Sequence, residues 1–287
     1  MRSVLEPSRR TRISGARQLA NRDLAQVLRV LDTDPVASCM VAARLQEYGL
    51  DGRGGHGELW SRGGPGSSMC FSGANLVPLR GGQEDLKAFA DRAARWPRLC
   101  SSVVGRQELA LPLWELLVGQ WGPARDLRAD QPLLALEGPA LAAPDAQVRR
   151  VRPDELDRYL VAAVAMFTEE IGVDPRSGDG GRGYRRRVAS LIQAGRAWAR
   201  FEDGQVVYKA EVGALSRRTG QIQGVWVHPE WRGRGLGASG TAAIANTVVA
   251  SGRTASLYVN SYNEVARRAY ARVGFRQIAT FATVLVD

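Results

Sequence analysis

A glycine- and arginine-rich segment between a strand-like run and a helix-like run constrains the fold of this chain more than any other feature. The apolar run 225–227 leads through a turn at His228-Pro229 into the Arg-Gly-Arg-Gly-Leu-Gly sequence of 232–237, and an apolar stretch over 241–250 follows. Glycines let the backbone approach an anion without an intervening Cβ, and the next helix adds partial positive charge at its N-terminus. The segment therefore predicts a strand, a pyrophosphate-binding loop and a helix.

Two other phosphate-binding motifs fit this segment less well. Residues 235–240 spell Gly-x-Gly-x-x-Gly, but a dinucleotide-binding fold has these glycines directly after an early strand and an acid about 20 residues later. Here a spacer over 228–233 intervenes, and the later region offers Asn260. The chain has no Gly-Lys-Ser/Thr sequence, which excludes a P-loop. An ordinary tight turn remains the structural alternative, although it needs fewer glycines and arginines.

The apolar pattern before the loop predicts antiparallel strands preceded by two helices. Asp203-Gly204 supplies the positive backbone angles of a tight hairpin, which joins strands over 197–202 and 205–215, and a third strand spans 221–227. The expected elements upstream are a strand over 147–151, a helix from Pro153 to about Glu170, a glycine-rich loop over 172–183 and a helix that ends at Ala194.

With these elements in this order, residues 147–287 resemble the GNAT N-acetyltransferase superfamily. Arg232, Gly235 and Gly237 match its acyl-CoA signature, Gln/Arg-x-x-Gly-x-Gly/Ala. The second motif of the family is matched by the run 257–260 and by Asn263, Ala266, Tyr270 and Gly274-Phe275. The resemblance implies an α/β (α+β) fold with a GNAT-like mixed, mostly antiparallel sheet flanked by helices.

The same resemblance implies acetyl-CoA as cosubstrate and a set of residues that bind it. The backbone of Val225, Trp226 and Val227 would pair with the pantetheine arm and polarise the thioester carbonyl. Asn260 and Asn263 would bind the pantetheine amides. Arg267 would pack against the adenine end or remain a solvated helix arginine. Backbone N–H groups would hold the pyrophosphate along the loop formed by Arg232, Gly233, Arg234, Gly235, Leu236, Gly237, Ala238 and Ser239.

Two catalytic residues are expected from the resemblance and from the neighbouring sequence. Tyr270 would protonate the leaving thiolate as general acid, unless it is a core tyrosine. Many relatives carry a carboxylate that acts as the catalytic base about four residues before the equivalent of Val227, but this chain has Gln223 there. Glu211 on the neighbouring strand is the nearest carboxylate. It would act as the base or instead pair with an arginine such as Arg200, and deprotonation through water is a third route.

The N-terminal part matches no motif, but its order of elements is informative. Helical spacing over 19–30, 35–48, 84–96 and 109–119 alternates with short apolar runs near 58–62, 68–71, 75–79, 99–104 and 132–136. This order predicts a smaller α/β domain over 19–145. The same order is compatible with a degenerate GNAT-like copy that has no cofactor loop. A basic tail over 1–18 precedes it, and the acetyltransferase domain spans 146–287.

Composition limits the remaining classes of function. The chain has 39 basic and 29 acidic residues, yet its arginine-rich segments, the tail over 1–18 and 182–187, are separated by long neutral stretches, so nucleic-acid binding is not expected. Cys39, Cys70 and Cys100 are odd in number and widely spaced, which indicates a cytoplasmic protein without a structural zinc site or other metal. The longest apolar run falls well short of the roughly 20 residues of a membrane-spanning helix.

The sequence therefore predicts an acetyl-CoA-dependent N-acetyltransferase. A primary amine, on a small molecule or on a protein or peptide, would attack the thioester directly in a ternary complex. A non-catalytic acyl-CoA-binding regulatory module is the alternative, and Gln223 favours it. An acidic group near the acceptor mouth would attract a cationic amine, unless arginines such as Arg176 and Arg182 neutralise it; the group comprises Glu169, Glu170, Asp174 and Asp179.

Overall fold

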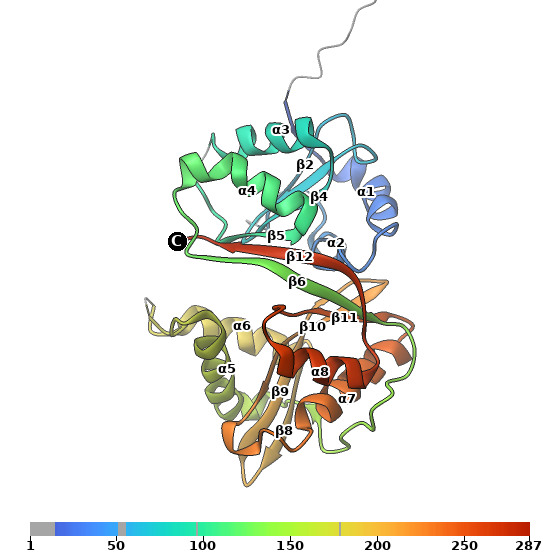
Figure 1. Ribbon diagram of the computed structural model, residues 1–287, viewed down its shortest axis with the longest axis vertical. Helices are drawn as coiled ribbons and strands as arrows, with labels where there is room; N and C mark the ends of the chain where they lie inside the picture. The colour runs from blue at the N-terminus through green and yellow to red at the C-terminus, as the bar shows by residue number, and fades with distance from the viewer. Residues whose placement is uncertain (1–14, 51–55, 96, 178) are drawn as a thin grey trace, which may run out of the picture.

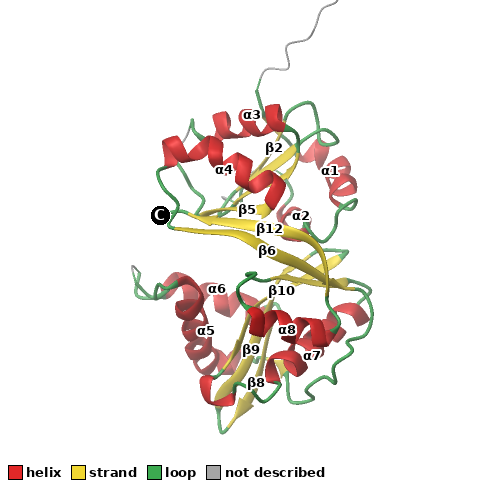
Figure 2. Ribbon diagram, viewed as in Figure 1, coloured by secondary structure: helices red, strands yellow, loops and turns green. Residues whose placement is uncertain are grey.

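A computed structural model describes residues 15–50, 56–95, 97–177 and 179–287 of the chain. Most of the predicted basic tail, 1–14, lies outside the described residues. Among the described residues, all strands belong to one 12-stranded sheet in the order β1-β2-β3-β4-β5-β12-β6-β11-β10-β9-β8-β7. Figures 1 and 2 show two groups of helices, α1–α4 and α5–α8, at opposite ends of the molecule, with β6 and β12 side by side between them.

The N-terminal half forms the first six strands and the first four helices. They are β1 (Arg17–Gln18), α1 (Leu24–Leu31), α2 (Cys39–Tyr48), β2 (Glu58–Ser61), β3 (Met69–Ser72), β4 (Leu76–Arg80), α3 (Gln83–Ala93), β5 (Ser102–Arg106), α4 (Gln107–Trp121) and β6 (Asp126–Leu136).

The C-terminal half repeats this order of elements. They are β7 (Arg149–Arg150), α5 (Leu156–Ile171), α6 (Arg182–Gln193), β8 (Ala197–Glu202), β9 (Gln205–Leu215), β10 (Thr219–Val227), α7 (Leu236–Ala250), β11 (Thr254–Tyr258), α8 (Glu264–Val273) and β12 (Arg276–Leu285). The predicted fold class, a mixed and mostly antiparallel sheet flanked by helices, is confirmed.

The two halves exchange their last strands. β12 pairs antiparallel with β5 of the other half, from Phe281 opposite Arg106 to Leu285 opposite Ser102. β6 pairs antiparallel with β11, from Leu133 to Leu136, and with β12 along its other edge. Strands β1 to β6 correspond in order to β7 to β12. If each strand is replaced by its counterpart, the same strand order results, read from the opposite edge of the sheet. The sheet thus has a pseudo-twofold arrangement whose centre is the β6–β12 pair.

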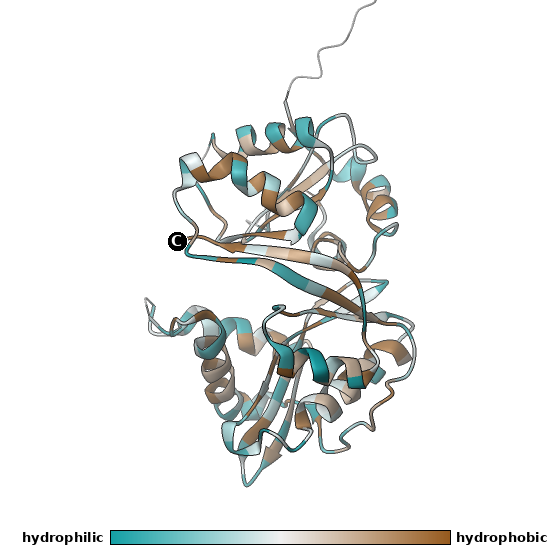
Figure 3. Cartoon of the chain, in the orientation of Figure 1, coloured by the Kyte–Doolittle hydropathy of each residue, from teal (hydrophilic) through white to brown (hydrophobic). Residues whose placement is uncertain are grey.

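The side chains of β6 divide between the cores of the two halves. Leu133 and Ala135 are buried in a cluster with α1 and α2, whereas Leu134 and Leu136 are buried in a cluster with α7 and α8. This alternation is the period of two that a strand imposes. Figure 3 shows β6 as hydrophilic over much of its length and hydrophobic towards its C-terminal end. Because only the second part of β6 is apolar, the sequence pattern predicted a strand over 132–136 alone.

Helix α5 starts at a buried carboxylate. Glu155 is 3% exposed and accepts hydrogen bonds from both terminal nitrogens of Arg149, at 2.7 and 2.8 Å. It also accepts the backbone N–H of Arg152 at 2.9 Å. These hydrogen bonds, above all those from Arg149, lower the pKa of Glu155 from 4.5 to about 2. The helix ends at Gly172, which has the left-handed conformation typical of a helix C-terminus.

We expect Glu155→Gln to weaken folding most at neutral pH. The pKa of Glu155 is depressed in the folded protein, so its contribution is present above about pH 4.5 and is lost as the pH falls towards 2. The shift from 4.5 to about 2 corresponds to at most about 3 kcal/mol. Urea unfolding at pH 7 and pH 3 measures the effect. A loss of stability in the variant that is equal at both pH values contradicts this account.

Candidate active site

Strands β10 and β11 separate in the middle of the C-terminal half. They pair in parallel only from Thr219 opposite Thr254 to Gln221 opposite Ser256, although both strands continue. A cavity of about 450 Å³, here called the central cavity, begins where they diverge, and residues 222–226 and 257–260 form two of its walls. Gly224 has φ +58° at a bulge of β10, and an added Cβ would lie 3.0 Å from Met166 Cε.

The loop after β10 presents an uninterrupted row of backbone donors. The N–H groups of residues 233–237 make no hydrogen bond to any residue that the structure describes. Gly233 and Gly235 have φ values of +78° and +85°, which glycine adopts without strain. These donors meet the N-terminus of α7, where the helix dipole adds partial positive charge. The arrangement is suited to an anion with several oxygen atoms, such as a pyrophosphate.

The side chains of the loop are anchored to neighbouring elements. Arg232 donates from Nε to the carbonyl of Val227 at 3.0 Å and from its guanidinium to Glu169 at 2.7 Å. Glu169 also accepts the indole N–H of Trp226 at 3.1 Å. Arg234 stacks over Trp231, with its guanidinium carbon 4.8 Å from the ring centroid. Leu236 and Ala238 are buried in the first turn of α7, and the Ser239 hydroxyl donates to the carbonyl of Gly235.

Val225 and Trp226 line the central cavity together with two of the expected amide side chains. Asn260 accepts a hydrogen bond from Gln131 Nε2 at 2.8 Å. Asn263 caps α8 by accepting the N–H of Ala266 at 3.1 Å, and it also lines the cavity. Arg267 instead lines a separate groove between α8 and β6, and it donates to the carbonyl of Ser261.

Tyr270 lies on α8 and lines the central cavity. Its side chain is buried, and its hydroxyl makes no hydrogen bond to another described residue. Burial and the negative charge of Glu170 raise the pKa of Tyr270 well above its usual value. The phenol is therefore protonated throughout the neutral range and holds a proton at the cavity wall.

Glu211 does not line the central cavity, and it lies in a buried ion pair. Its carboxylate is 1% exposed and accepts a hydrogen bond from Lys209 Nζ at 2.9 Å. Arg187 lies 3.9 Å away. Burial raises the pKa of Glu211, but the two positive charges and the hydrogen bonds it accepts outweigh burial, so the net shift is downward.

The structure therefore favours the structural role that the sequence left open for Glu211, with a different partner. Lys209, two residues away on the same strand, pairs with it, whereas Arg200 pairs with Glu202 and Asp145. Gln223 lines the cavity and donates to Glu211 Oε2 at 3.4 Å. Gln223 thus stands between this carboxylate and the cavity, and the expectation of a catalytic base at Glu211 lacks geometric support.

Residues of the N-terminal half complete the cavity, and the sequence analysis did not find them. Arg128 and Gln131 come from β6, Ser102 from β5 and Asn75 from the turn before β4. Gln131 is 3% exposed and accepts the hydroxyl of Thr283 at 2.6 Å. The sequence holds no signal for Arg128 and Gln131, because residues 126–131 are mostly polar and do not read as a buried strand.

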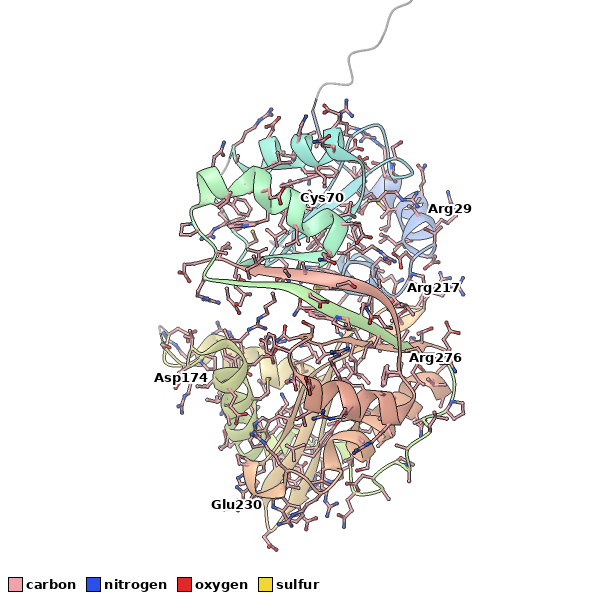
Figure 4. The ribbon with its side chains drawn as sticks, viewed as in Figure 1. Arg29, Cys70, Asp174, Arg217, Glu230 and Arg276 are labelled. Atoms are coloured by element: carbon pink, nitrogen blue, oxygen red, sulfur yellow. The ribbon has the colours of Figure 1, made fainter. Side chains whose placement is uncertain are left out.

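The acidic group expected near the acceptor mouth separates into two sets. Asp174 lies at the loop between α5 and α6 (Figure 4) and does not line the central cavity, and Arg176 pairs with it at 2.7 Å. Asp179 accepts the N–H groups of Gly181 and Gly183. Only Glu169 and Glu170 of this group are among the residues that line the central cavity.

Two family models match separate parts of the chain. Residues 57–159 match a domain of unknown function (DUF4081), and residues 206–285 match the model described as FR47-like protein. No curated protein sequence matches the chain.

Solved structures similar to the chain cover almost its whole length. A Drosophila protein superposes with a TM-score of 0.67 at 12% identity, over 94% of this chain and 98% of that one. A GNAT-family acetyltransferase from Colwellia psychrerythraea gives 0.56 at 12% identity, over 95% and 99%. A tandem GNAT protein from the clavulanic acid biosynthesis pathway gives 0.56 at 14% identity, over 94% and 98%. The chain has the GNAT fold.

The N-terminal half is a second GNAT-like copy, as its order of elements predicted. Its counterpart of the central cavity lies where β4 and β5 separate after a single pair, Leu76 opposite Val103. Only Gly81 and Gly82 connect β4 to α3, so this copy has no long loop of backbone donors. Arg106 and Asp34 form an ion pair at 2.7 Å within the smaller cavity there, which measures about 240 Å³.

The described part of the chain contains no cluster of His, Cys, Asp or Glu side chains that could hold a metal ion. Among the same residues, no helix has both the length and the apolar character needed to cross a membrane. Cys39, Cys70 and Cys100 are free thiols and are all buried.

We expect Lys209→Met to destabilise the fold severely. The substitution leaves the buried Glu211 carboxylate without its main partner, which costs about 3–5 kcal/mol. The double variant Lys209→Met/Glu211→Leu replaces the pair by apolar side chains and should regain most of that loss. Chemical unfolding of the three proteins measures both effects. Equal stability of the single and double variants would show that the ion pair does not hold Glu211 in place.

Proposed function

We propose that this protein is an acetyl-CoA-dependent N-acetyltransferase that acts on a primary amine. The observation that carries the proposal is the row of five unpaired N–H groups over 233–237, next to a cavity that opens between two diverging strands. The row suits the pyrophosphate of CoA, and the gap between β10 and β11 suits its pantetheine arm. The acceptor is a small molecule or a protein or peptide amine.

The residues around the cavity support direct transfer in a ternary complex. Backbone groups of residues 225–227 on the open edge of β10 would pair with the pantetheine and polarise the thioester carbonyl. The amine nitrogen attacks the carbonyl carbon, a C–N bond forms, and the C–S bond then breaks. Tyr270, protonated and unbonded at the cavity wall, would give its proton to the leaving thiolate. Asn260 and Asn263 would bind the pantetheine amides.

A non-catalytic acyl-CoA-binding module is the second candidate. It is favoured by Gln223 at the position where relatives carry a base and by the engagement of Glu211 with Lys209. Such a module would bind CoA and transfer no acetyl group to any amine. The division into a domain over 19–145 and an acetyltransferase domain over 146–287, a cytoplasmic location and the absence of a nucleic-acid partner remain parts of this proposal.

We expect CoA and acetyl-CoA to raise the melting temperature, and NAD to leave it unchanged. Binding to the native state at 100 times the dissociation constant adds about 2.7 kcal/mol. Gly237→Asp should abolish the shift, because the carboxylate would place negative charge among the loop donors. Thermal-shift titration measures both. A shift with NAD and none with CoA contradicts the proposal.

Gly237 is the best position for this test, and Gly237→Ala is its matched control. Its φ is not positive, and an added Cβ would approach no atom closer than 3.9 Å, whereas Gly235 has φ +85°. The alanine variant should fold normally and keep most of the CoA shift. If Gly237→Asp folds and retains the shift as well, the loop does not hold the pyrophosphate.

We expect Tyr270→Phe to lower turnover by about 100- to 10,000-fold, the range typical of a lost general acid. The affinity for acetyl-CoA should stay within a few-fold, because the hydroxyl acts on the leaving thiolate and not on binding. Release of free thiol from acetyl-CoA over a panel of amines gives the rate, and the thermal shift gives the affinity. Wild-type turnover in the variant would leave Tyr270 with a packing role only.

A further inference from the structure

The central cavity has one acidic residue that no part of the proposed function uses. Glu170 lies in the last turn of α5, lines the cavity and has a half-exposed side chain. Its neighbour Glu169 is occupied by Trp226 and Arg232. The carboxylate of Glu170 accepts no hydrogen bond from another described residue. It therefore has the freedom to receive a ligand that enters the cavity.

Arg128 holds the end of α5 in place from the other half of the molecule. Its side chain is 8% exposed, and its guanidinium donates to the backbone carbonyl of Glu170 at 2.8 Å. A second nitrogen lies 3.7 Å from the Glu170 carboxylate, and Nε donates to Asp126 at 2.8 Å. A cation at a helix C-terminus is favourable, so this contact also stabilises the last turn of α5. Arg128 reaches α5 because β6 lies at the centre of the shared sheet.

Glu170 lines the same cavity as Tyr270, the tyrosine that the proposed mechanism uses. Burial is the main cause that raises the pKa of Tyr270, and the charge of Glu170 is the other. Tyr258, Tyr270 and Glu170 all line the cavity. The carboxylate of Glu170 and the phenol of Tyr270 thus belong to two walls of the same cavity, formed by α5 and α8.

We propose that Glu170 is the base that receives the acceptor amine, and that Arg128 is its positioning residue. This inference rests on the proposed acetyltransferase function and names the part of the site that the sequence left open. The acceptor is then a primary amine that enters as an ammonium ion. The polar side chains of Gln131, Ser102 and Asn75 offer hydrogen bonds to the rest of the acceptor from the N-terminal half.

The proton balance of the step is closed. Glu170 takes one proton from the ammonium ion, directly or through a water molecule, and releases it to solvent after the reaction. The neutral amine attacks the thioester carbonyl carbon, the C–N bond forms and the C–S bond breaks. The thiolate takes the proton of Tyr270, and Tyr270 regains one from the nitrogen of the new amide. An ammonium ion and acetyl-CoA thus give the acetamide, CoA and one proton.

The test compares two kinds of acceptor, protonated amines and a neutral one, that differ in their need for a base. Spermidine, phenethylamine and a lysine-containing peptide carry amines that are protonated near neutral pH, whereas hydroxylamine is neutral there. We expect Glu170→Gln to lower kcat/KM for the amine that wild type acetylates by about 100-fold or more. The loss with hydroxylamine should be no more than a few-fold. The thermal shift with CoA should remain, because Glu170 makes no contact with the loop donors.

The pH profile gives a second readout. Glu170 is faced by charged or titratable groups from four elements: Arg128 and Asp126 on β6, Tyr258 on β11, Tyr270 on α8 and Tyr184 on α6, with Glu169 beside it on α5. In Glu170→Gln, kcat/KM for the protonated amine acceptor, here called the alkylamine, should keep rising with pH. Without the base, the enzyme must bind the neutral amine that is already present in solution, and its share grows with pH. Arg128→Lys should lower kcat for the alkylamine less than Glu170→Gln does, and change KM little.

Asp174→Asn is the matched control, because it removes one negative charge close to α5 but outside the cavity. It should behave as wild type with both acceptors. If Asp174→Asn and Glu170→Gln lower kcat/KM equally, and added salt reduces both losses, the acidic residues attract cations in general and Glu170 is not the base. Equal losses with alkylamine and hydroxylamine would do the same. A wild type that binds CoA but acetylates neither acceptor overturns the proposed function itself, and the base with it.

Discussion

The pairing of β6 with β12 at the centre of the sheet is the interaction on which the rest of this structure depends. Each strand completes the sheet of the half to which it does not belong by sequence, through β5–β12 and β6–β11 ladders. A half without its partner would expose the backbone donors and acceptors of β5 or β11 as a bare edge. The exchange therefore makes the two halves one cooperative unit and carries Arg128 and Gln131 to the central cavity.

The pseudo-twofold arrangement breaks down where the chemistry is expected. Both halves separate their fourth and fifth strands, but only the C-terminal half follows the fourth strand with a long loop of glycines and arginines. In the N-terminal half two glycines make the connection, and the Arg106–Asp34 ion pair occupies the gap. One copy is thus suited to a pyrophosphate, and the other supplies cavity walls and a central strand.

Local signals in the sequence predicted the C-terminal half well. The hairpin strands 197–202 and 205–215 have the predicted bounds, because Asp203-Gly204 fixes the turn, and Asp203 has φ +47°. The strand exchange could not be predicted, since it joins segments about 150 residues apart and β6 buries the polar Arg128 and Gln131 while it exposes Leu127. The partner of Glu211 could have been predicted from the sequence, because Lys209 lies two residues away and therefore on the same face of the strand.

The buried pair of Lys209 and Glu211 also accounts for the glutamine at position 223. Gln223 donates to Glu211 at 3.4 Å and lies across Gly213, where an added Cβ would come within 2.1 Å of its side chain. A glutamate at position 223 would bring two carboxylates together with low exposure, and one of them would have its pKa raised. Glu211 would then repel any carboxylate base at position 223 of β10. A carboxylate on the opposite wall, beside Arg128, avoids that repulsion, which is the position that Glu170 occupies.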